Sequence, residues 1–183
     1  MNIVKFGTKL FQAAPSTSNS YDVFRGYFSA ARDSKSLSAF LSDLFSKINH
    51  DMENHESNER KMEIMRQLIF INTQQHDTAW ADFFILDVMS IDNFSAKRIA
   101  YTAAELCWKP NSDVVLMAIN QIQRDLNCGN HLVVSVVLSS IHSFLSQALA
   151  RQISGDVIQL MNSSKAYIRQ KAIIIFLSVC LKT

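Results

Sequence analysis

The sequence has few residues of the kind that make tight turns. Its 183 residues include only 4 glycines and 2 prolines, whereas 48% of the residues are hydrophobic. A sheet protein of this length needs many tight turns, and glycine and proline are the residues that such turns use most. The chain is also long enough to bury a substantial core. The composition therefore predicts an all-α protein and argues against a β-sheet fold.

Neither cysteine nor net charge points to a metal or a nucleic acid. Cys107, Cys128 and Cys180 are odd in number, far apart and set among helix-forming residues, and no CxxC or His–Cys cluster occurs. This pattern favours a reduced, cytoplasmic compartment over a disulfide framework or a zinc site. The formal net charge is only +2. Nucleic-acid-binding domains are usually strongly basic, so no nucleic-acid partner is predicted.

Motifs of catalysis are missing as well. The chain has no GxSxG, HExxH, P-loop or GxGxxG sequence, so we predict that it is not an enzyme and uses no cofactor. His50 and His55 stand among acidic residues and could suggest a metal cluster, but the polar, Asn-rich setting of residues 50–60 favours a helix end and a solvated loop. His131 and His142 are expected to be packing or surface residues.

No stretch is long and apolar enough to span a bilayer. The most apolar run, AIIIFLSVCL near the C-terminus, has ten residues, and a membrane-spanning helix needs about twenty. Lys5 and Lys9 interrupt what could have been a secretory signal, and Asn2 excludes N-myristoylation. We predict that residues 1–20 are a flexible extension, with a mitochondrial transit peptide as the alternative.

What the sequence does contain is helical periodicity. Residues 94–126 are expected to form two antiparallel helices joined by a turn at Pro110, with Asn111 or Ser112 as the N-cap of the second helix and Gly129 after its end. The expected helix 77–90 contains many aromatic and aliphatic residues. They predict that this helix is buried on more than one side, or alternatively that it forms an exposed groove for a peptide. Further helices are expected at 21–31, 37–48, 61–71, 131–144, 149–161 and 167–181.

The helices recur with a loose period. Ala100, Val137 and Ala172 are separated by 37 and 35 residues, and each lies in an apolar helix that follows a polar turn. Two helices per unit of this length are typical of HEAT and armadillo repeats. The spacing predicts a right-handed α-solenoid of antiparallel helix pairs over residues 21–183. An ordinary globular helical domain remains the alternative.

Four segments resemble signatures of the large adaptin subunits of clathrin-adaptor complexes. They are DTAWADFFILDVMS, AKRIAYTAAEL, NQIQRDL and SSKAYIRQKAIIIF, in this order along the chain. The tryptophan and the VMS wording resemble most the delta-type subunit of the third adaptor complex. The resemblance covers about residues 21–182. Ala100 replaces a glycine of the family pattern and Gln170 replaces a lysine, which removes one positive charge.

The resemblance implies a function and a set of partners. It suggests a non-catalytic subunit of a vesicle coat that works between the Golgi or endosomes and lysosome- or vacuole-like organelles. The subunit would be peripheral on these membranes and assemble with small, medium and beta-type large subunits. Because large adaptins continue for many more repeats, we expect a solenoid truncated at its C-terminal end, with an uncovered apolar face on the helix 167–181. The alternatives are an epsilon- or gamma-type adaptin, or a HEAT scaffold of nuclear transport or phosphatase regulation.

The resemblance also suggests a contact surface. Large adaptins use this region to approach phosphoinositide-bearing membranes and Arf-family GTPases, and helix N-termini attract anions. The opposite expectation is that these cations pair with neighbouring helices, while Tyr101 and Tyr167 pack between repeats. The candidate contact residues, all at the starts of repeat helices, are Lys97, Arg98, Lys165, Arg169 and Lys171.

Overall fold

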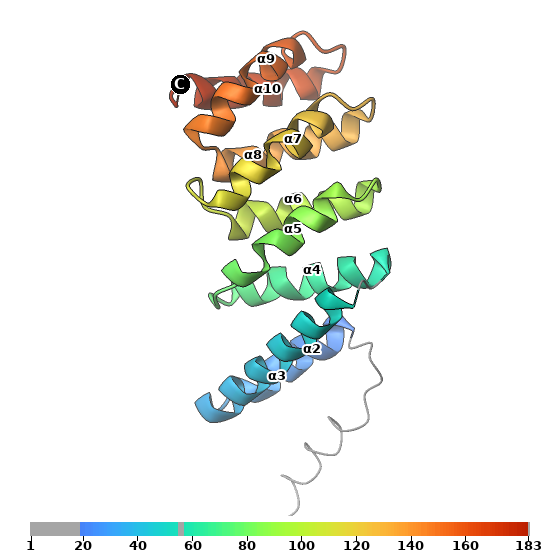
Figure 1. The fold of residues 1–183 in the computed structure, drawn as a ribbon, viewed down its shortest axis with the longest axis vertical. Helices are drawn as coiled ribbons and strands as arrows, with labels where there is room; N and C mark the ends of the chain where they lie inside the picture. Colours follow the sequence, from blue (N-terminus) through green and yellow to red (C-terminus); the bar gives the residue numbers. More distant parts are fainter. Residues whose placement is uncertain (1–18, 55–56, 183) are drawn as a thin grey trace, which may run out of the picture. The chain divides into compact units, whose positions relative to one another are not determined.

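A computed structural model describes residues 19–54 and 57–182 of the chain (Figure 1). All of the regular structure in these two ranges is helical. The chain divides into two compact units, residues 1–55 and 56–183. The range predicted for the solenoid, residues 21–183, includes residues of both units. Most of the predicted extension, residues 1–20, lies outside the described residues.

The first unit contains helices α2 (Ser20–Ala30) and α3 (Ser34–Glu53), which pack on each other. The side chain of Asp33 caps α3 by accepting a hydrogen bond from the backbone N–H of Ser36 at 3.1 Å. The sequence placed the end of α3 too early. Its last turn includes His50 and continues to Glu53, so the first part of the predicted loop 50–60 is helical. In α2 Val23 and Tyr27 are buried, whereas Phe28 is exposed.

The second unit is built from hairpins of antiparallel helices that stack in two layers (Figure 1). One layer consists of α4, α6, α8 and α10, and the other of α5, α7 and α9. The hairpins are α5–α6, α7–α8 and α9–α10. This arrangement confirms the predicted all-α solenoid. The elements are α4 (Asn58–Thr73), the short 3₁₀ helix η1 (Ala79–Ala81), α5 (Asp82–Ser90), α6 (Phe94–Cys107), α7 (Asp113–Leu126), α8 (His131–Phe144), α9 (Gln147–Leu160) and α10 (Ala166–Cys180).

The predicted repeat period corresponds to one of the two layers. Ala100, Val137 and Ala172 lie in α6, α8 and α10, and all three side chains are completely buried. Small or β-branched side chains at these positions allow neighbouring helices of a layer to approach each other closely. The period therefore marks the helix–helix contacts along the α4–α6–α8–α10 layer.

The phase of the hairpins differs from the prediction. The helices expected over residues 94–126 exist as α6 and α7, but they belong to successive hairpins: α6 packs mainly on α4, α5 and α8, and α7 on α5, α8 and α9. The turn at Pro110 thus connects two hairpins. Periodicity locates apolar faces but does not state which neighbour covers them, which is why the sequence suggested the wrong pairing.

The aromatic residues before α6 are only partly buried. The predicted helix 77–90 begins with η1, and only Asp82–Ser90 is α-helical. Phe83 is 61% exposed and Trp80 is also exposed. The helix therefore buries one side, because it lies in the α5–α7–α9 layer and no described helix of the second unit covers the outer side of that layer. The buried residues of α5 are Phe84, Ile85, Val88 and Met89.

A further local expectation is corrected by the structure. Ser112 stands at the N-cap position of α7, but its hydroxyl donates to the carbonyl of Lys109 at 2.9 Å, and neither Ser112 nor Asn111 caps the helix through its side chain. Gly155 lies inside α9, where a helix glycine could permit a close approach. A Cβ atom added at Gly155 would meet nothing within 4 Å, so no neighbour requires a glycine there.

The helix α10 has both buried and exposed aliphatic residues. Ile168, Ala172, Ile175 and Val179 are buried against the preceding helices. On its other sides three large aliphatic residues are exposed: Ile173, Ile174 and Leu177.

Candidate functional site

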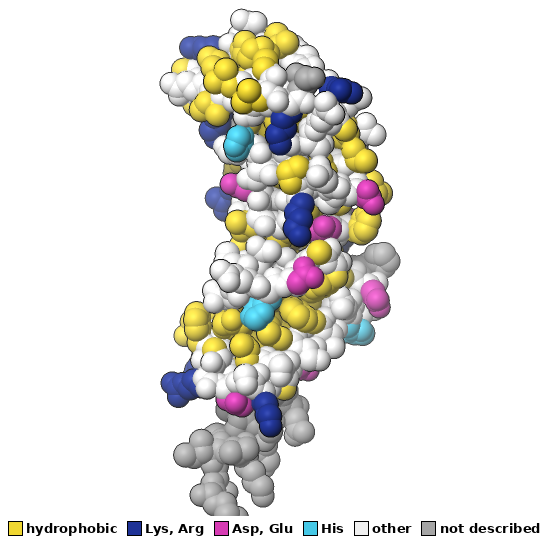
Figure 2. Space-filling view, turned by 90° about the vertical axis from the view of Figure 1, so that its left-hand side faces the viewer, with side chains coloured by type: hydrophobic (Ala, Val, Ile, Leu, Met, Phe, Trp, Pro, Cys, Tyr) yellow, Lys and Arg dark blue, Asp and Glu magenta, His cyan; other side chains and the backbone are white. Residues whose placement is uncertain are grey.

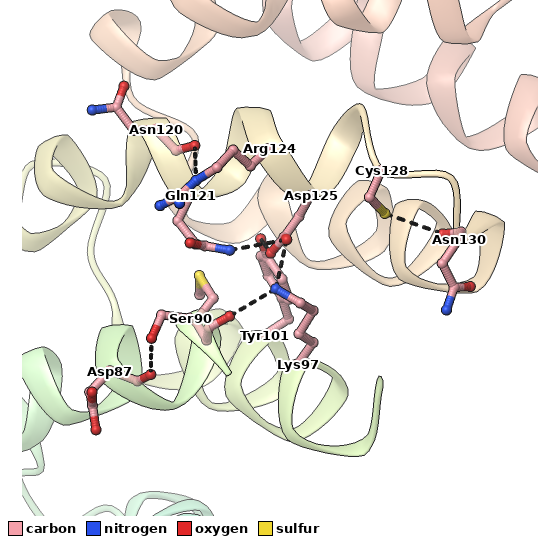
Figure 3. A network of polar contacts seen from close by, with 11 residues as sticks. Asp87, Ser90, Lys97, Tyr101, Asn120, Gln121, Arg124, Asp125, Cys128 and Asn130 are labelled. Atoms are coloured by element: carbon pink, nitrogen blue, oxygen red, sulfur yellow. Dashed lines mark hydrogen bonds and ion pairs between the residues drawn. The ribbon is translucent and has the colours of Figure 1, made fainter. Parts of the chain in front are cut away.

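The residues of two signature segments meet at one buried carboxylate, that of Asp125 in the last turn of α7 (Figure 3). Asp125 is 3% exposed. Its Oδ1 accepts hydrogen bonds from Lys97 Nζ at 2.7 Å and from Gln121 Nε2 at 3.0 Å, and its Oδ2 accepts one from Tyr101 Oη at 2.8 Å. We call these four residues the Asp125 network. It joins α6 to α7, the two helices that belong to different hairpins.

The ammonium of Lys97 extends the network to a third helix. Lys97 is 7% exposed, and its Nζ also donates to the carbonyl of Met89 at 3.2 Å, in the last turn of α5. Carbonyl groups at a helix C-terminus carry partial negative charge and attract a cation. Lys97 therefore bridges the end of α5 and the carboxylate of α7.

Because it is buried, the Asp125 network matters for the stability of the fold. A buried charge that loses its partner destabilises a protein by about 3–5 kcal/mol, whereas a pair with good hydrogen bonds is tolerated. Burial raises the pKa of Tyr101 well above its ordinary value, and the negative charge of Asp125 raises it further. Tyr101 thus stays a hydrogen-bond donor. With three donors on one carboxylate, the arrangement is suited to holding helices together.

A second acidic residue lacks such donors. Asp82, in the first turn of α5, has a buried Oδ1 with no hydrogen-bond partner. Burial, and then the nearby carboxylate of Asp77, raise the pKa of Asp82 to about 6. Beside it, the Cys107 thiol accepts a hydrogen bond from Thr78 Oγ1 at 3.4 Å, and burial raises the pKa of this thiol. A thiol with a raised pKa is a poor nucleophile.

The structure removes Lys97 from the predicted contact surface. Its side chain is buried and its ammonium is paired with Asp125, so it cannot reach a membrane or a partner. For this residue the opposite expectation, a pair with the carboxylate of a neighbouring helix, is correct. Tyr101 is completely buried, as predicted, whereas Tyr167 is partly exposed and lies beside the ring of His131.

Two other candidate cations are half-buried and bonded within the fold. Arg169 Nη1 donates to the carbonyls of Ser163 at 2.8 Å and Ser164 at 3.2 Å, in the turn between α9 and α10. Lys171 Nζ donates to the carbonyl and the hydroxyl of Ser135 and to the hydroxyl of Ser139. Lys171 thereby ties α10 to α8.

Arg98 and Lys165 remain as exposed cations. Their side chains form no hydrogen bond or ion pair with any residue of the described ranges. Arg98 lines a shallow hollow between α4 and α6 together with Arg66. Lys165 stands at the N-cap position of α10, which has no side-chain cap. On the face drawn in Figure 2, the Lys and Arg side chains are spread singly.

Sequence reasoning missed Asp125 as the partner of Lys97 and Gln121 as a further donor to Asp125. The signal was present in NQIQRDL, because an acid at position 125 interrupts the buried face of α7 between Ile122 and Leu126. An acidic residue on an otherwise apolar helix face needs a partner when it is buried.

A profile of the adaptin N-terminal region matches residues 40–183 of this chain. The chain belongs to the adaptin family. The four segments on which the resemblance rested all lie within the matched residues, and in this adaptin chain two of them build the Asp125 network.

The similar proteins include subunits of the third adaptor complex. The chain is 37% identical over 116 residues to "AP-3 complex subunit delta-1" of Bos taurus, covering 63% of this chain and 10% of that protein. It is 30% identical over 164 residues to "AP-3 complex subunit delta" of Saccharomyces cerevisiae, covering 88% of this chain and 18% of that protein. The expected resemblance to delta-type subunits is confirmed. The chain spans only about a tenth to a fifth of the length of these relatives.

One structure of similar fold is named "Homology model of the full-length AP-3 complex in an intermediate open conformation". It matches this adaptin chain with a TM-score of 0.59 and 30% sequence identity, over 69% of this chain and 22% of that chain. Among the residues described here, no group of three His, Cys, Asp or Glu residues could hold a metal ion. His55, part of the cluster considered from sequence, lies outside them. None of the described helices has the length and apolar character needed to cross a membrane.

Proposed function

We propose that this chain is a trunk segment of an adaptor-protein coat complex and that it works by binding other proteins, without catalysis. The observation that carries the proposal is the family match over residues 40–183, in which the signature residues Lys97, Tyr101 and Asp125 hold three helices together. A rigid stack of helix pairs presents an extended surface, which is the property that a scaffold needs.

The names of the similar proteins suggest the system. The chain would assemble with small, medium and beta-type large subunits of a complex related to the third adaptor complex, and serve vesicle transport from the Golgi or endosomes to lysosome- or vacuole-like organelles. It would be peripheral on these membranes. The likeness to chains named as AP-3 delta subunits, and to a structure of that complex, supports this interpretation.

Co-purification from the native cell tests the assembly. A tagged chain should recover one small, one medium and one beta-type large subunit. The variant Asp125→Ala, which keeps the tag but is expected to be less stable by about 3–5 kcal/mol, is the control and should recover smaller amounts. Recovery of nuclear-transport or phosphatase components in place of coat subunits would overturn the proposal, as would the absence of every coat subunit from the material recovered with the parent chain.

We also propose that the chain makes a weak contact with an anionic membrane or with an Arf-family GTPase, and that this contact is centred on Arg98 and Lys165. Both side chains are exposed and unpaired within the described ranges, and the uncapped N-terminus of α10 adds backbone N–H groups that favour anions. Arg169 and Lys171 would contribute little, since their donors already bind carbonyls and hydroxyls of the fold.

Charge reversal tests this contact. The double variant Arg98→Glu, Lys165→Glu should bind phosphoinositide-containing liposomes, or the GTP-loaded GTPase, several-fold more weakly than the parent chain. Arg151→Glu changes the charge of another exposed residue, in α9, and is the control. Melting and helicity should be the same in all three chains. Unchanged recruitment of the double variant would contradict the contact.

A further inference from the structure

The connection between α4 and α5, residues 74–81, is anchored to two helices through Thr78. This residue is 2% exposed. Its hydroxyl accepts a hydrogen bond from Asn72 Nδ2, in the last turn of α4, at 3.0 Å and donates one to Cys107 Sγ, at the end of α6, at 3.4 Å. The position of the connection therefore depends on a short chain of hydrogen bonds that runs from α4 to α6.

The start of this α4–α5 connection is strained. Gln75 has a φ of 64°, in the left-handed region that residues with a Cβ atom rarely adopt. The backbone N–H of Gln75 donates to the carbonyl of Asn72 at 2.8 Å, and that of His76 to the carbonyl of Ile71 at 3.3 Å. Glycine is the usual residue where a helix ends in this way. A strained turn persists only while its surroundings hold it, so contacts at the other end of the connection matter.

The other end of the connection meets a buried carboxylate oxygen that has no donor. Asp82 Oδ1 is buried and has no hydrogen-bond partner. The backbone N–H of Asp82 does not serve it, because this group donates to the carbonyl of Ala79 in η1. Burial without donors disfavours the ionised form of a carboxyl group far more than the neutral form. The protonation state of Asp82 therefore changes how favourably the start of α5 stays packed.

The groups that act on Asp82 electrostatically come from three segments. Burial is the main cause of its raised pKa, the carboxylate of Asp77 in the connection raises the pKa further, and the ammonium of Lys109 after α6 opposes them. At the end of α6, burial raises the pKa of the Cys107 thiol and the charge of Asp82 adds to it. His76 stands in the same connection, and histidines in general change charge near neutral pH. A test of Asp82 must therefore exclude His76.

We propose that the α4–α5 connection is a pH-dependent joint, closed while Asp82 is protonated and opening locally when Asp82 is ionised. In the closed form Thr78 is bound to α4 and α6 as described. In the open form the carboxylate of Asp82 reaches water, the strain at Gln75 is released and the thiol of Cys107 is exposed. The stack stays folded in both forms, because α4 and α5 each pack mainly on α6 and less on each other.

The direction of the pH dependence follows from the two protonation states. The pKa of Asp82 is about 6 in the folded chain against an ordinary value of 3.8, so the closed form holds the proton more strongly. Closure is therefore most favourable below about pH 4, and opening increases as the pH rises to about 6 and is level above it. The pKa difference limits this increase to about a hundredfold, and solvent screening at the half-buried Asp82 reduces it to several-fold.

Amide hydrogen exchange measures the opening in the full chain. Each exchange rate at residues 79–82 is divided by the rate of the same amide in an unstructured peptide, which removes the ordinary effect of pH on exchange. The corrected rate should rise several-fold between about pH 4.5 and 6.5 and stay level to about pH 7.5. Low concentrations of urea should leave it unchanged, because a local opening exposes little surface.

Three variants assign the pH dependence to one residue. Asp82→Asn keeps the size of the side chain without its charge and should show the same corrected rate at both pH values. Asp87→Asn removes an exposed carboxylate of the same helix, and His76→Gln removes the other titratable candidate. Both of these variants should keep the pH dependence of the parent chain. If Asp82→Asn does not fold by circular dichroism, the uncharged Asp82→Ala replaces it with the same expected result.

The thiol of Cys107 gives a second readout. In a chain with Cys128→Ser and Cys180→Ser, a pyridyl disulfide reagent labels Cys107 at acid as well as neutral pH. The labelling rate is divided by that of the same chain unfolded in urea at the same pH. This ratio should rise several-fold over the range in which the amides open, and the rise should be absent after Asp82→Asn.

Three results would overturn the proposal. The first is a corrected exchange rate at residues 79–82 that does not change with pH. The second is a pH dependence that persists in Asp82→Asn or disappears in His76→Gln, since another group would then be responsible. The third is exchange that depends on urea as strongly as global unfolding does, because the whole stack would then open together.

Discussion

The signature segments in α6 and α10 of this adaptin chain each hold a basic residue three positions before a buried alanine, Ala100 or Ala172, but use it differently. In α6 the ammonium of Lys97 is buried between a helix end and the carboxylate of Asp125. In α10 the guanidinium of Arg169 binds a turn of its own hairpin and remains half-exposed. The difference shows that a carboxylate on another helix, here Asp125, decides whether a signature cation joins two hairpins or binds within its own hairpin.

Among the variants that test this comparison, loss of Asp125 should have the largest effect on the free energy of unfolding. Asp125→Ala leaves Lys97 buried without a counter-charge and should lower the free energy of unfolding by about 3–5 kcal/mol. Urea denaturation followed by circular dichroism measures it. Asp87→Ala removes the exposed ion pair with Lys61 and should cost about 1 kcal/mol or less. Similar losses in the two variants would show that the Asp125 network is no more important than a surface pair.

The tyrosines of the α6 and α10 segments should give the next largest effect on the free energy of unfolding. Tyr101→Phe removes a hydrogen bond to the charged Asp125 and should lower the free energy of unfolding by about 1.5–3 kcal/mol. Tyr167→Phe, in the other segment, changes a partly exposed residue and should stay within about 0.5 kcal/mol. Thermal melting of both variants against the parent chain separates the two roles. A larger loss for Tyr167→Phe would reverse the comparison.

Lys171 offers an intermediate case. Its ammonium ties α10 to α8 through Ser135 and Ser139 at a half-buried position. Lys171→Met keeps the aliphatic stem and should lower the free energy of unfolding by about 1 kcal/mol. Lys165→Met, where the side chain is exposed, should change it by less than about 0.5 kcal/mol. Equal values in chemical denaturation would mean that the serine contacts add nothing.

The last prediction concerns Asp82, a carboxylate that lacks the donors of Asp125. Its pKa of about 6 in the folded chain lies above the ordinary value of 3.8, so the folded state holds the proton more strongly than the unfolded state. The contribution of Asp82 to stability is present below about pH 4 and is lost as the pH rises through about 6. Asp82→Asn should therefore gain stability relative to the parent chain between about pH 4 and 7. A difference that does not change with pH in denaturation curves would contradict the raised pKa.

The sequence predicted the helices and the layer contacts more reliably than the partners of polar residues. Ala100, Val137 and Ala172 were predicted from spacing alone, because a buried stripe repeats whenever the same kind of neighbour recurs. The pairing of α6 with α5 was missed, since both of its chain neighbours have apolar faces of similar length.

The sequence did not separate the buried from the exposed residues of the predicted contact surface. Five basic residues at helix starts look alike in sequence, yet Lys97 is buried and Arg98, the next residue, is exposed. Consecutive helix positions are about 100° apart, so adjacent residues can point to the interior and to solvent. Only the position of Asp125, contributed by a different hairpin, distinguishes the two roles.

The Asp125 network also means that the hairpins of this chain are not interchangeable. Ala118 of α7 and Ile153 of α9 are both completely buried and lie 35 residues apart, and the same spacing places Leu160 of α9 at the position of Asp125. If the hairpin α9–α10 followed α6 directly, the ammonium of Lys97 would therefore be buried against an aliphatic side chain in place of a carboxylate. Such an arrangement of the same helix pairs would be unstable although its apolar periodicity was unchanged.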